Sequence, residues 1–191
     1  MLYSRSGARK YVTLAERQRF IEEAKRADPK IETFCIALAY TGARISEVLN
    51  LNHQAFDYSA KCIVIESLKK RRAGVFRTVP VPDELLDRIE EVHQIRSQVE
   101  GEVASTRLWN WCRTTAWKHV KVVMMEANII GPHAVPKALR HGFGVLGTVE
   151  AGVPLNIMQK WLGHARIETT ARYADAVGRE ERILARRLWT R

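Results

Sequence analysis

Apolar residues recur at helical spacing along most of the chain and take on an extended, strand-like pattern only near its centre. The segment 13–16, Thr-Leu-Ala-Glu, is a capping box and predicts a helix from there to about Ala27. Residues 31–40 are apolar on most faces, which indicates a buried helix that ends at Gly42. A further helix is predicted over 44–51. The first quarter of the chain is therefore expected to be helical.

Two strand-like stretches follow, at 61–68 and 75–81. The basic, glycine-containing segment between them, 69–74, predicts the tip of a β-hairpin. Pro82 is then expected at the first position of a helix that runs from 83 to about 98. This part of the chain predicts a small antiparallel sheet followed by a return to helix.

The remaining chain is again helical. An amphipathic helix is predicted from Thr114 to about Ala127, and Pro136 opens the helix that carries Lys137 and Arg140. Shorter helices are predicted near 154–161, 167–174 and 179–188. Together these elements predict a mainly helical (α+β) domain with a minor antiparallel sheet.

The charge balance favours a polyanionic partner. The 191 residues suit one domain, or one with a small appendage. Lys and Arg outnumber Asp and Glu by 31 to 21, which gives a formal net charge of +10. Such a field attracts nucleic acid, although charge alone is equally compatible with another kind of basic protein.

Cysteine usage and hydropathy restrict the compartment and the class of protein. Cys35, Cys62 and Cys112 are far apart and odd in number, which supports neither a zinc ribbon nor a disulfide framework. The first ten residues lack the apolar stretch of a secretory signal, and no uncharged run approaches about 18 residues. We therefore expect a cytoplasmic protein without a membrane partner.

Two candidate catalytic side chains lie close together near the end of the chain. His164 follows a glycine, and Tyr173 comes nine residues after His164. A phenol is a poor nucleophile unless acids, bases and cations surround it. Arg166 and Arg172 provide such a basic setting for Tyr173. His164 on its own would more often be a helix-cap partner.

Two earlier motifs supply further cations. An arginine can bond two phosphate oxygens at once and stays charged, which suits phosphoryl transfer. Arg44 follows a glycine turn, and Glu47 can hold its guanidinium, although the plainer interpretation of this spacing is a surface ion pair. Lys137 and Arg140 are three residues apart and are predicted to share one helix face.

Two alternative sites are rejected. Residues 142–147 match G-x-G-x-x-G, but no strand precedes them, so we expect small residues for close helix packing rather than a dinucleotide site. His133, His141 and His164 lack carboxylate or thiolate partners at ligand spacing, so no metal site is predicted. His141 is expected to face away from Arg140 and to pack in the core.

In this order and spacing, the motifs around Arg44, Arg140, His164 and Tyr173 resemble the tyrosine recombinase (phage integrase) family, from about residue 13 to 177. The resemblance implies a mainly α (α+β) catalytic domain with a small three-stranded antiparallel sheet. It implies that the chain consists of an N-terminal tail (1–12), the catalytic domain (13–177) and a C-terminal helix or tail (178–191). The C-terminal helix is a candidate for docking on a neighbouring protomer.

The resemblance also implies roles for single residues. Tyr173 would attack the scissile phosphate. The side chains that would hold and neutralise this phosphate are Arg44, Lys137, Arg140 and His164, with Glu47 in support. A hairpin lysine ahead of the segment 77–80 would protonate the departing 5′ oxygen, with Lys69 the first candidate and Lys70 the second. The side chains expected to contact DNA there are Lys70, Arg71 and Arg72.

The chain departs from the family in two ways. Lys137 stands where the family usually has histidine, and an exposed lysine largely stays charged while histidine exchanges protons near neutral pH. His133 is a poor replacement, because Pro136 intervenes. Second, most members carry an N-terminal helical domain. The chain is either an excised catalytic domain or naturally minimal, like the fimbrial-switch invertases.

The activity implied is site-specific recombination of double-stranded DNA through a 3′-phosphotyrosyl link, without a metal, ATP or any other cofactor. Four protomers on two duplexes, a dimer at each site, would form the working assembly, with accessory DNA-bending proteins as further partners and a nucleoid-associated location. Two alternatives stay open, a type IB topoisomerase-like relaxer and a DNA-binding module that has lost catalysis.

Overall fold

The computed structural model describes residues 2–5, 7–68, 74–96 and 106–174, together with 182, 185, 186 and 189. The first helix, α1 (Leu14–Ala24), begins at the predicted capping box. The Thr13 hydroxyl accepts from the Glu16 backbone N–H, and the Glu16 carboxylate accepts from the Thr13 N–H at 2.8 Å. These two bonds satisfy N–H groups that the helix itself leaves unpaired.

The central helix is α2 (Pro29–Thr41), which is mostly buried and packs against α1, α4 and α6. Asp28 caps its start, and Gly42 ends it in the left-handed conformation with φ of 59°. The short helix α3 (Ile45–Leu49) follows directly. The predicted buried helix and its glycine stop are both confirmed.

The sheet is three-stranded and antiparallel in the order β1-β2-β3. After a 3₁₀ turn, η1 (His53–Ala55), the strands are β1 (Phe56–Asp57), β2 (Cys62–Glu66) and β3 (Phe76–Pro80). Ile63 pairs with Val79 and Ile65 with Arg77, and these four residues are buried while their neighbours on β3 are exposed. The predicted hairpin strands are confirmed, at slightly shorter length; its tip, 69–73, lies outside the described residues.

Two helices follow the sheet. The helix α4 (Asp83–His93) begins after Pro82, which is its N-cap rather than its first residue. It ends well before the predicted position 98, because Gln94 adopts a left-handed φ of 52° and caps it. The next helix, α5 (Arg113–Glu126), agrees with the prediction to within one residue at each end.

The C-terminal half of the described chain consists of α6 (Pro136–Val145), the π-helical turn η4 (Leu146–Glu150), α7 (Leu155–Leu162) and α8 (Ile167–Ala171). The glycines of 142–147 do allow close packing: a Cβ at each helical glycine there would lie 2.3–2.6 Å from Val12, Tyr173 or Met158. The expected C-terminal helix at 179–188 lies mostly outside the described residues.

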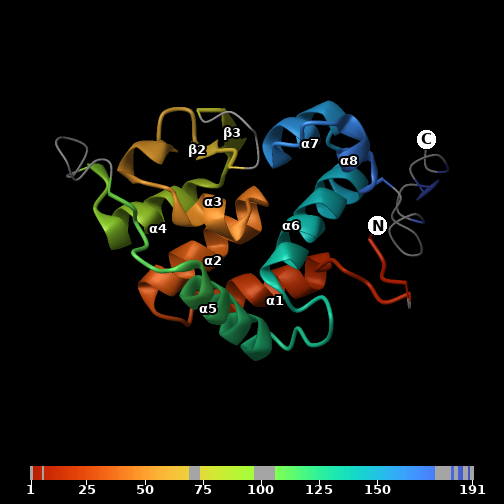
Figure 1. Ribbon diagram of the computed structural model, residues 1–191, viewed down its shortest axis with the longest axis horizontal. Helices are drawn as coiled ribbons and strands as arrows, with labels where there is room; N and C mark the ends of the chain where they lie inside the picture. The colour runs from red at the N-terminus through yellow and green to blue at the C-terminus, as the bar shows by residue number, and fades with distance from the viewer. Residues whose placement is uncertain are drawn as a thin grey trace.

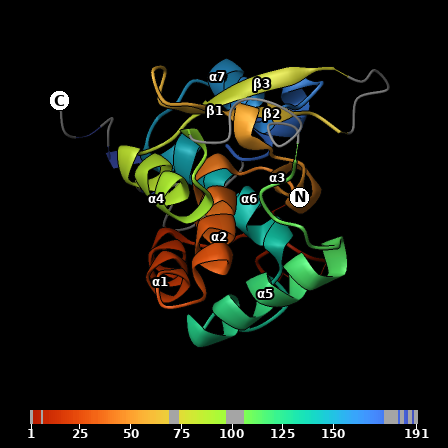
Figure 2. The ribbon, with the colours of Figure 1, turned by 90° about the vertical axis from the view of Figure 1, so that its left-hand side faces the viewer.

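Figures 1 and 2 show the layering of these elements, with the sheet and α7 at one end, α1 and α5 at the other, and α2 and α6 between. The main core gathers around α2, and a smaller apolar cluster under α6 and α7 includes Leu2, Tyr11 and Tyr173. The fold is mainly helical with a small antiparallel sheet, as predicted. Within the part of the chain that the structure describes, no helix is long and apolar enough to cross a membrane.

Candidate active site

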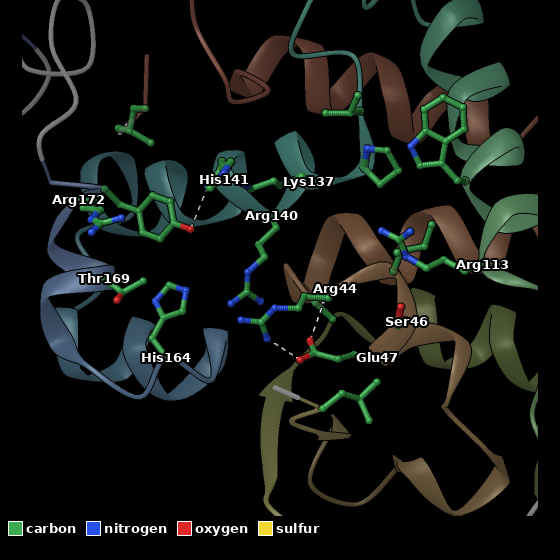
Figure 3. Close-up of a pocket in the computed structure, with 18 residues that line it drawn as sticks. Arg44, Ser46, Glu47, Arg113, Lys137, Arg140, His141, His164, Thr169 and Arg172 are labelled. Atoms are coloured by element: carbon green, nitrogen blue, oxygen red, sulfur yellow. Dashed lines mark hydrogen bonds and ion pairs between the residues drawn. The ribbon is translucent and has the colours of Figure 1, made fainter. Parts of the chain in front are cut away.

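A pocket of about 640 Å³ opens between α3, α5, α6 and the α7–α8 region (Figure 3). Figure 3 shows Arg44, Arg140 and His164 pointing into the same space, with Lys137 and Arg113 along its edge. The polar side chains that line it are Arg44, Ser46, Glu47, Arg113, Lys137, Arg140, His141, His164, Thr169, Arg172 and Tyr173. Residues from segments far apart in sequence therefore face one cationic space.

Arg44 is the N-cap residue of α3 and enters the pocket from there, held by Glu47. The Arg44 backbone N–H donates to one Glu47 oxygen at 2.9 Å, and its guanidinium donates to the other at 2.6 Å. Glu47 is buried, and a second guanidinium, that of Arg77, also donates to it at 2.7 Å. Burial alone would raise the pKa of Glu47, but Arg77 and Arg44 outweigh burial and hold this pKa below its ordinary value. The predicted Arg44–Glu47 contact is present.

Arg77 is a buried residue of the site that the sequence analysis did not single out. Besides Glu47, it donates to the Ser67 hydroxyl at 3.0 Å and to the Trp161 carbonyl at 2.7 Å. Arg77 therefore ties β3 to α3 and to the last turn of α7. The available signal was strand alternation, because Arg77 occupies an inward position two residues from the buried Val79.

Arg140, from α6, is fixed by backbone carbonyls at two helix ends. Its guanidinium donates to the Gly42 carbonyl at 2.8 Å and to the Leu162 carbonyl at 2.6 Å. Burial, with the nearby charge of Arg44, lowers the pKa of Arg140 to about 10, so the group is still a cation at neutral pH. The carboxyl ends of α2 and α7 favour this positive charge and leave it little freedom to move.

Lys137 precedes Arg140 by one helical turn and is exposed at the pocket edge. Both side chains line the pocket, so the predicted shared face of α6 is confirmed. His133, in contrast, bonds Glu16 at 3.1 Å and lies near Arg9, away from the pocket. It does not take the place of the family's usual histidine.

His164 is placed by the end of α7. Gly163 adopts a left-handed φ of 64°, and a Cβ there would lie 3.0 Å from the Ser67 hydroxyl, so the turn that delivers His164 requires glycine. The ring Nδ1 lies 2.9 Å from the Thr170 hydroxyl. The imidazole stacks on the Tyr173 ring, with centroids 6.0 Å apart and an interplanar angle of 18°.

Tyr173 follows α8 and is 4% exposed. Burial raises the pKa of its phenol, and the nearby Arg140, Arg44 and Arg172 only partly offset this effect. The phenol oxygen lies 3.2 Å from Nδ1 of His141. The hydroxyl group is therefore protonated near neutral pH and held by a single histidine contact.

The expected core position of His141 is wrong. On a helical wheel His141 and Arg140 point in different directions. The side of α6 that carries His141 is nevertheless not covered by the core, because Tyr173 lies against it and the pocket reaches it. His141 is half-buried, lines the pocket and contacts the phenol. Lys69, Lys70, Arg71 and Arg72 lie outside the described residues, so their predicted roles stay predictions.

The arrangement can bind an anion and present a phenol to it. A phosphodiester entering the pocket would meet two guanidiniums that are already fixed, which is the preorganised form of charge stabilisation. Among the residues described, no group of three or more His, Cys, Asp or Glu is placed to hold a metal ion.

Comparisons with known proteins identify the relatives of this chain. Residues 10–179 match the sequence model of the Phage integrase family. The chain is 27% identical to tyrosine recombinase XerA of Pyrococcus furiosus over 168 residues, covering 86% of this chain and 56% of that protein. It is 30% identical to the type 1 fimbriae regulatory protein FimE of Escherichia coli over 173 residues, covering 86% of this chain and 85% of FimE.

Among solved structures, the XerH site-specific recombinase bound to its palindromic difH substrate, in a post-cleavage complex, superimposes with a TM-score of 0.76. That match has 18% identity and covers 95% of this chain and 54% of XerH, so it supports the fold. The chain spans about half the length of the XerA relatives it matches. Because the family model covers most of the chain and FimE matches over nearly its whole length, the chain belongs to the phage integrase family of tyrosine recombinases.

Proposed function

We propose that this chain is a site-specific DNA recombinase in which Tyr173 attacks a phosphodiester of double-stranded DNA. The observation that carries the proposal is the placement of the Tyr173 phenol beside Arg44 and Arg140, both fixed by internal hydrogen bonds. Family membership and the DNA-bound state of XerH support DNA as the substrate.

In the proposed reaction, the Tyr173 oxygen forms a bond to phosphorus while the bond from phosphorus to the 5′ oxygen breaks. The link keeps the energy of the broken bond, so no ATP is needed. Arg44 and Arg140 bind the nonbridging oxygens, where negative charge develops, and they supply the stabilisation that metal ions give in other phosphoryl-transfer sites. Lys137 and His164 donate to the same phosphate, and Lys69 or Lys70 protonates the 5′ oxygen.

Strand exchange between two duplexes breaks four strands, and each break uses one tyrosine. The assembly that follows is a homotetramer, with two protomers on each DNA site. The 5′ hydroxyl of a partner strand attacks the phosphotyrosyl link and releases Tyr173. The net positive charge of +10 assists the first encounter with DNA.

The test uses a nicked suicide duplex, from which the cleaved fragment diffuses away and traps the covalent adduct. Wild type is expected to form the adduct in excess EDTA, and Tyr173→Phe is expected to bind the duplex with unchanged affinity but form none. The matched control is Tyr40→Phe, the same change outside the pocket, in a ring that packs on the core and under Arg17. It should form the adduct at the wild-type rate.

An adduct that persists in Tyr173→Phe would refute the assignment of the nucleophile. The absence of any adduct from wild type would refute the proposed activity and favour a binding module. A two-site substrate then separates the remaining alternative, because a recombinase joins new partners whereas a relaxer rejoins the same strand.

A further inference from the structure

The hydrogen bond between His141 and Tyr173 lies at the attacking oxygen but has no role in the reaction proposed above. Nδ1 of His141 lies 3.2 Å from the phenol oxygen, within hydrogen-bond distance. Among the described residues, no other side chain has a hydrogen bond to this oxygen. The contact joins residues 32 positions apart, from α6 and from the turn after α8.

The attacking phenol must lose its proton. Because burial raises the pKa of Tyr173, a negligible fraction of the phenol is ionised near pH 7. A base that accepts a proton in the transition state must lie within hydrogen-bond distance of the group that loses it. His141 meets this condition in the structure.

His141 is also in the protonation state that can accept. Burial, together with the positive charges of Lys137 and Arg140 on the same helix and of Lys10 from the N-terminal segment, lowers the pKa of His141 to about 4. The ring is therefore neutral near pH 7, and one of its two nitrogens carries a lone pair. The tautomer protonated on Nε2 presents that lone pair from Nδ1 to the phenol.

The neighbouring groups are less suited to this step. Nδ1 of His164 is engaged with Thr170 at 2.9 Å, and its ring lies parallel to the Tyr173 ring instead of meeting the phenol oxygen. A lysine ammonium such as that of Lys137 has donors but no acceptor. Lys137 stands where the family usually has histidine, so a proton acceptor has to come from elsewhere.

We propose that His141 is a catalytic residue, the general base that accepts the phenol proton as Tyr173 attacks phosphorus. This inference rests on the proposed function. As the bond from the Tyr173 oxygen to phosphorus forms, the phenol proton passes to Nδ1, and the electron pair of the breaking bond leaves with the 5′ oxygen. In the rejoining step, the imidazolium returns its proton to the departing Tyr173 oxygen.

The fold holds the two groups in this geometry. Gly144 lies three residues after His141 on α6, and a Cβ at this position would lie 2.6 Å from the Tyr173 ring. The ring therefore packs directly on the α6 backbone, one turn from His141. His141 meets the phenol oxygen because the helix has no side chain at 144.

The test is single-turnover cleavage of the suicide duplex by His141→Asn. Asparagine places an oxygen close to the position of Nδ1, so it keeps a hydrogen bond to the phenol but cannot take up the proton. Cleavage should fall by roughly 10²–10⁴-fold, the usual contribution of general base catalysis, while affinity for DNA is unchanged. The matched control is His119→Asn, on α5, where the ring lies against Trp111 outside the pocket, with the ring centroids 4.6 Å apart. It should cleave at the wild-type rate.

Two further measurements separate proton transfer from a structural role. Between pH 7 and 9, the rate of His141→Asn should rise about tenfold per pH unit, because only the ionised phenol then reacts, whereas the wild-type rate should be nearly flat. A duplex with sulfur in place of the scissile 5′ oxygen needs no acid for its leaving group, and the defect of His141→Asn should persist on it. His141→Gln should behave as His141→Asn does, should the latter fold poorly.

A His141→Asn enzyme that cleaves at the wild-type rate would overturn the inference and leave the proposed function intact, since wild type would still form the adduct. A defect that disappears on the sulfur substrate would also overturn it, because His141 would then serve the leaving group. A wild type that forms no adduct would overturn the proposed function and this inference together.

Discussion

Replacing Gly144 by alanine should displace the attacking tyrosine and slow cleavage more than it destabilises the fold. A Cβ at position 144 would lie 2.6 Å from two carbons of the Tyr173 ring and 2.7 Å from a third. Non-bonded carbons prefer a separation of about 3.5–4.0 Å, so the ring has to move by about 1 Å. The backbone of α6 cannot easily yield, because Gly142 of the same helix already contacts the Val12 carbonyl.

Two terms of opposite sign determine the stability of Gly144→Ala. Alanine within a helix is favoured over glycine by about 1 kcal/mol. Overpacking of a well-filled site costs about 1–3 kcal/mol. The free energy of unfolding should therefore fall by no more than about 2 kcal/mol. Catalysis is more sensitive, because a misplacement of about 1 Å can lower a rate by about 10²-fold.

The assay combines denaturant unfolding with single-turnover cleavage of the suicide duplex. Gly147→Ala is the matched control, because its Cβ would meet the flexible side chain of Met158 at 2.5 Å instead of the Tyr173 ring. It should lose no more stability than Gly144→Ala and cleave at close to the wild-type rate. A Gly144→Ala variant that cleaves as fast as wild type would refute the argument that α6 sets the position of Tyr173.

Three further predictions concern buried charges and the pocket edge. The substitution Glu47→Gln removes the carboxylate that pairs with Arg77, whose side chain is 4% exposed. It should lower the free energy of unfolding, measured in urea, by about 3–5 kcal/mol, because a buried charge loses its partner. An unchanged free energy of unfolding would contradict the importance of this pair. Burial opposes ionisation of Glu16, but hydrogen bonds from Arg9 and Thr13 lower its pKa from 4.5 to about 2. The stabilisation from ionised Glu16 is therefore complete above pH 4.5 and is lost as the pH falls through about 2. Over this pH range the free energy of unfolding should decrease less for Glu16→Gln than for wild type, as measured by unfolding at a series of pH values. Lys137→His should cleave the suicide duplex with a modest loss of rate and Lys137→Ala far more slowly, because the phosphate loses a donor; equal rates for wild type and Lys137→Ala would show that the position has no catalytic role.

Local signals in the sequence were sufficient for most helices and for part of the site. The capping box at 13–16 and the glycine stop at Gly42 act through bonds within a few residues, so the sequence contains all of their partners. The same holds for Arg44 and Glu47, which are three residues apart. The end of α4 was missed because Gln94 is not a residue type that marks a left-handed cap.

The sequence by itself therefore determined the helical character, the hairpin and the order of the motifs that identify the family. Tertiary structure alone decided how Arg77, Arg140 and His141 are used. Arg77 becomes a link between three elements only when β3 meets α3 and α7, and Arg140 finds its acceptors at the ends of α2 and α7. His141 contacts the phenol because Gly144 lets the Tyr173 ring approach α6. Periodicity reports which face of a helix is buried, but the group that covers this face depends on packing between residues distant in sequence.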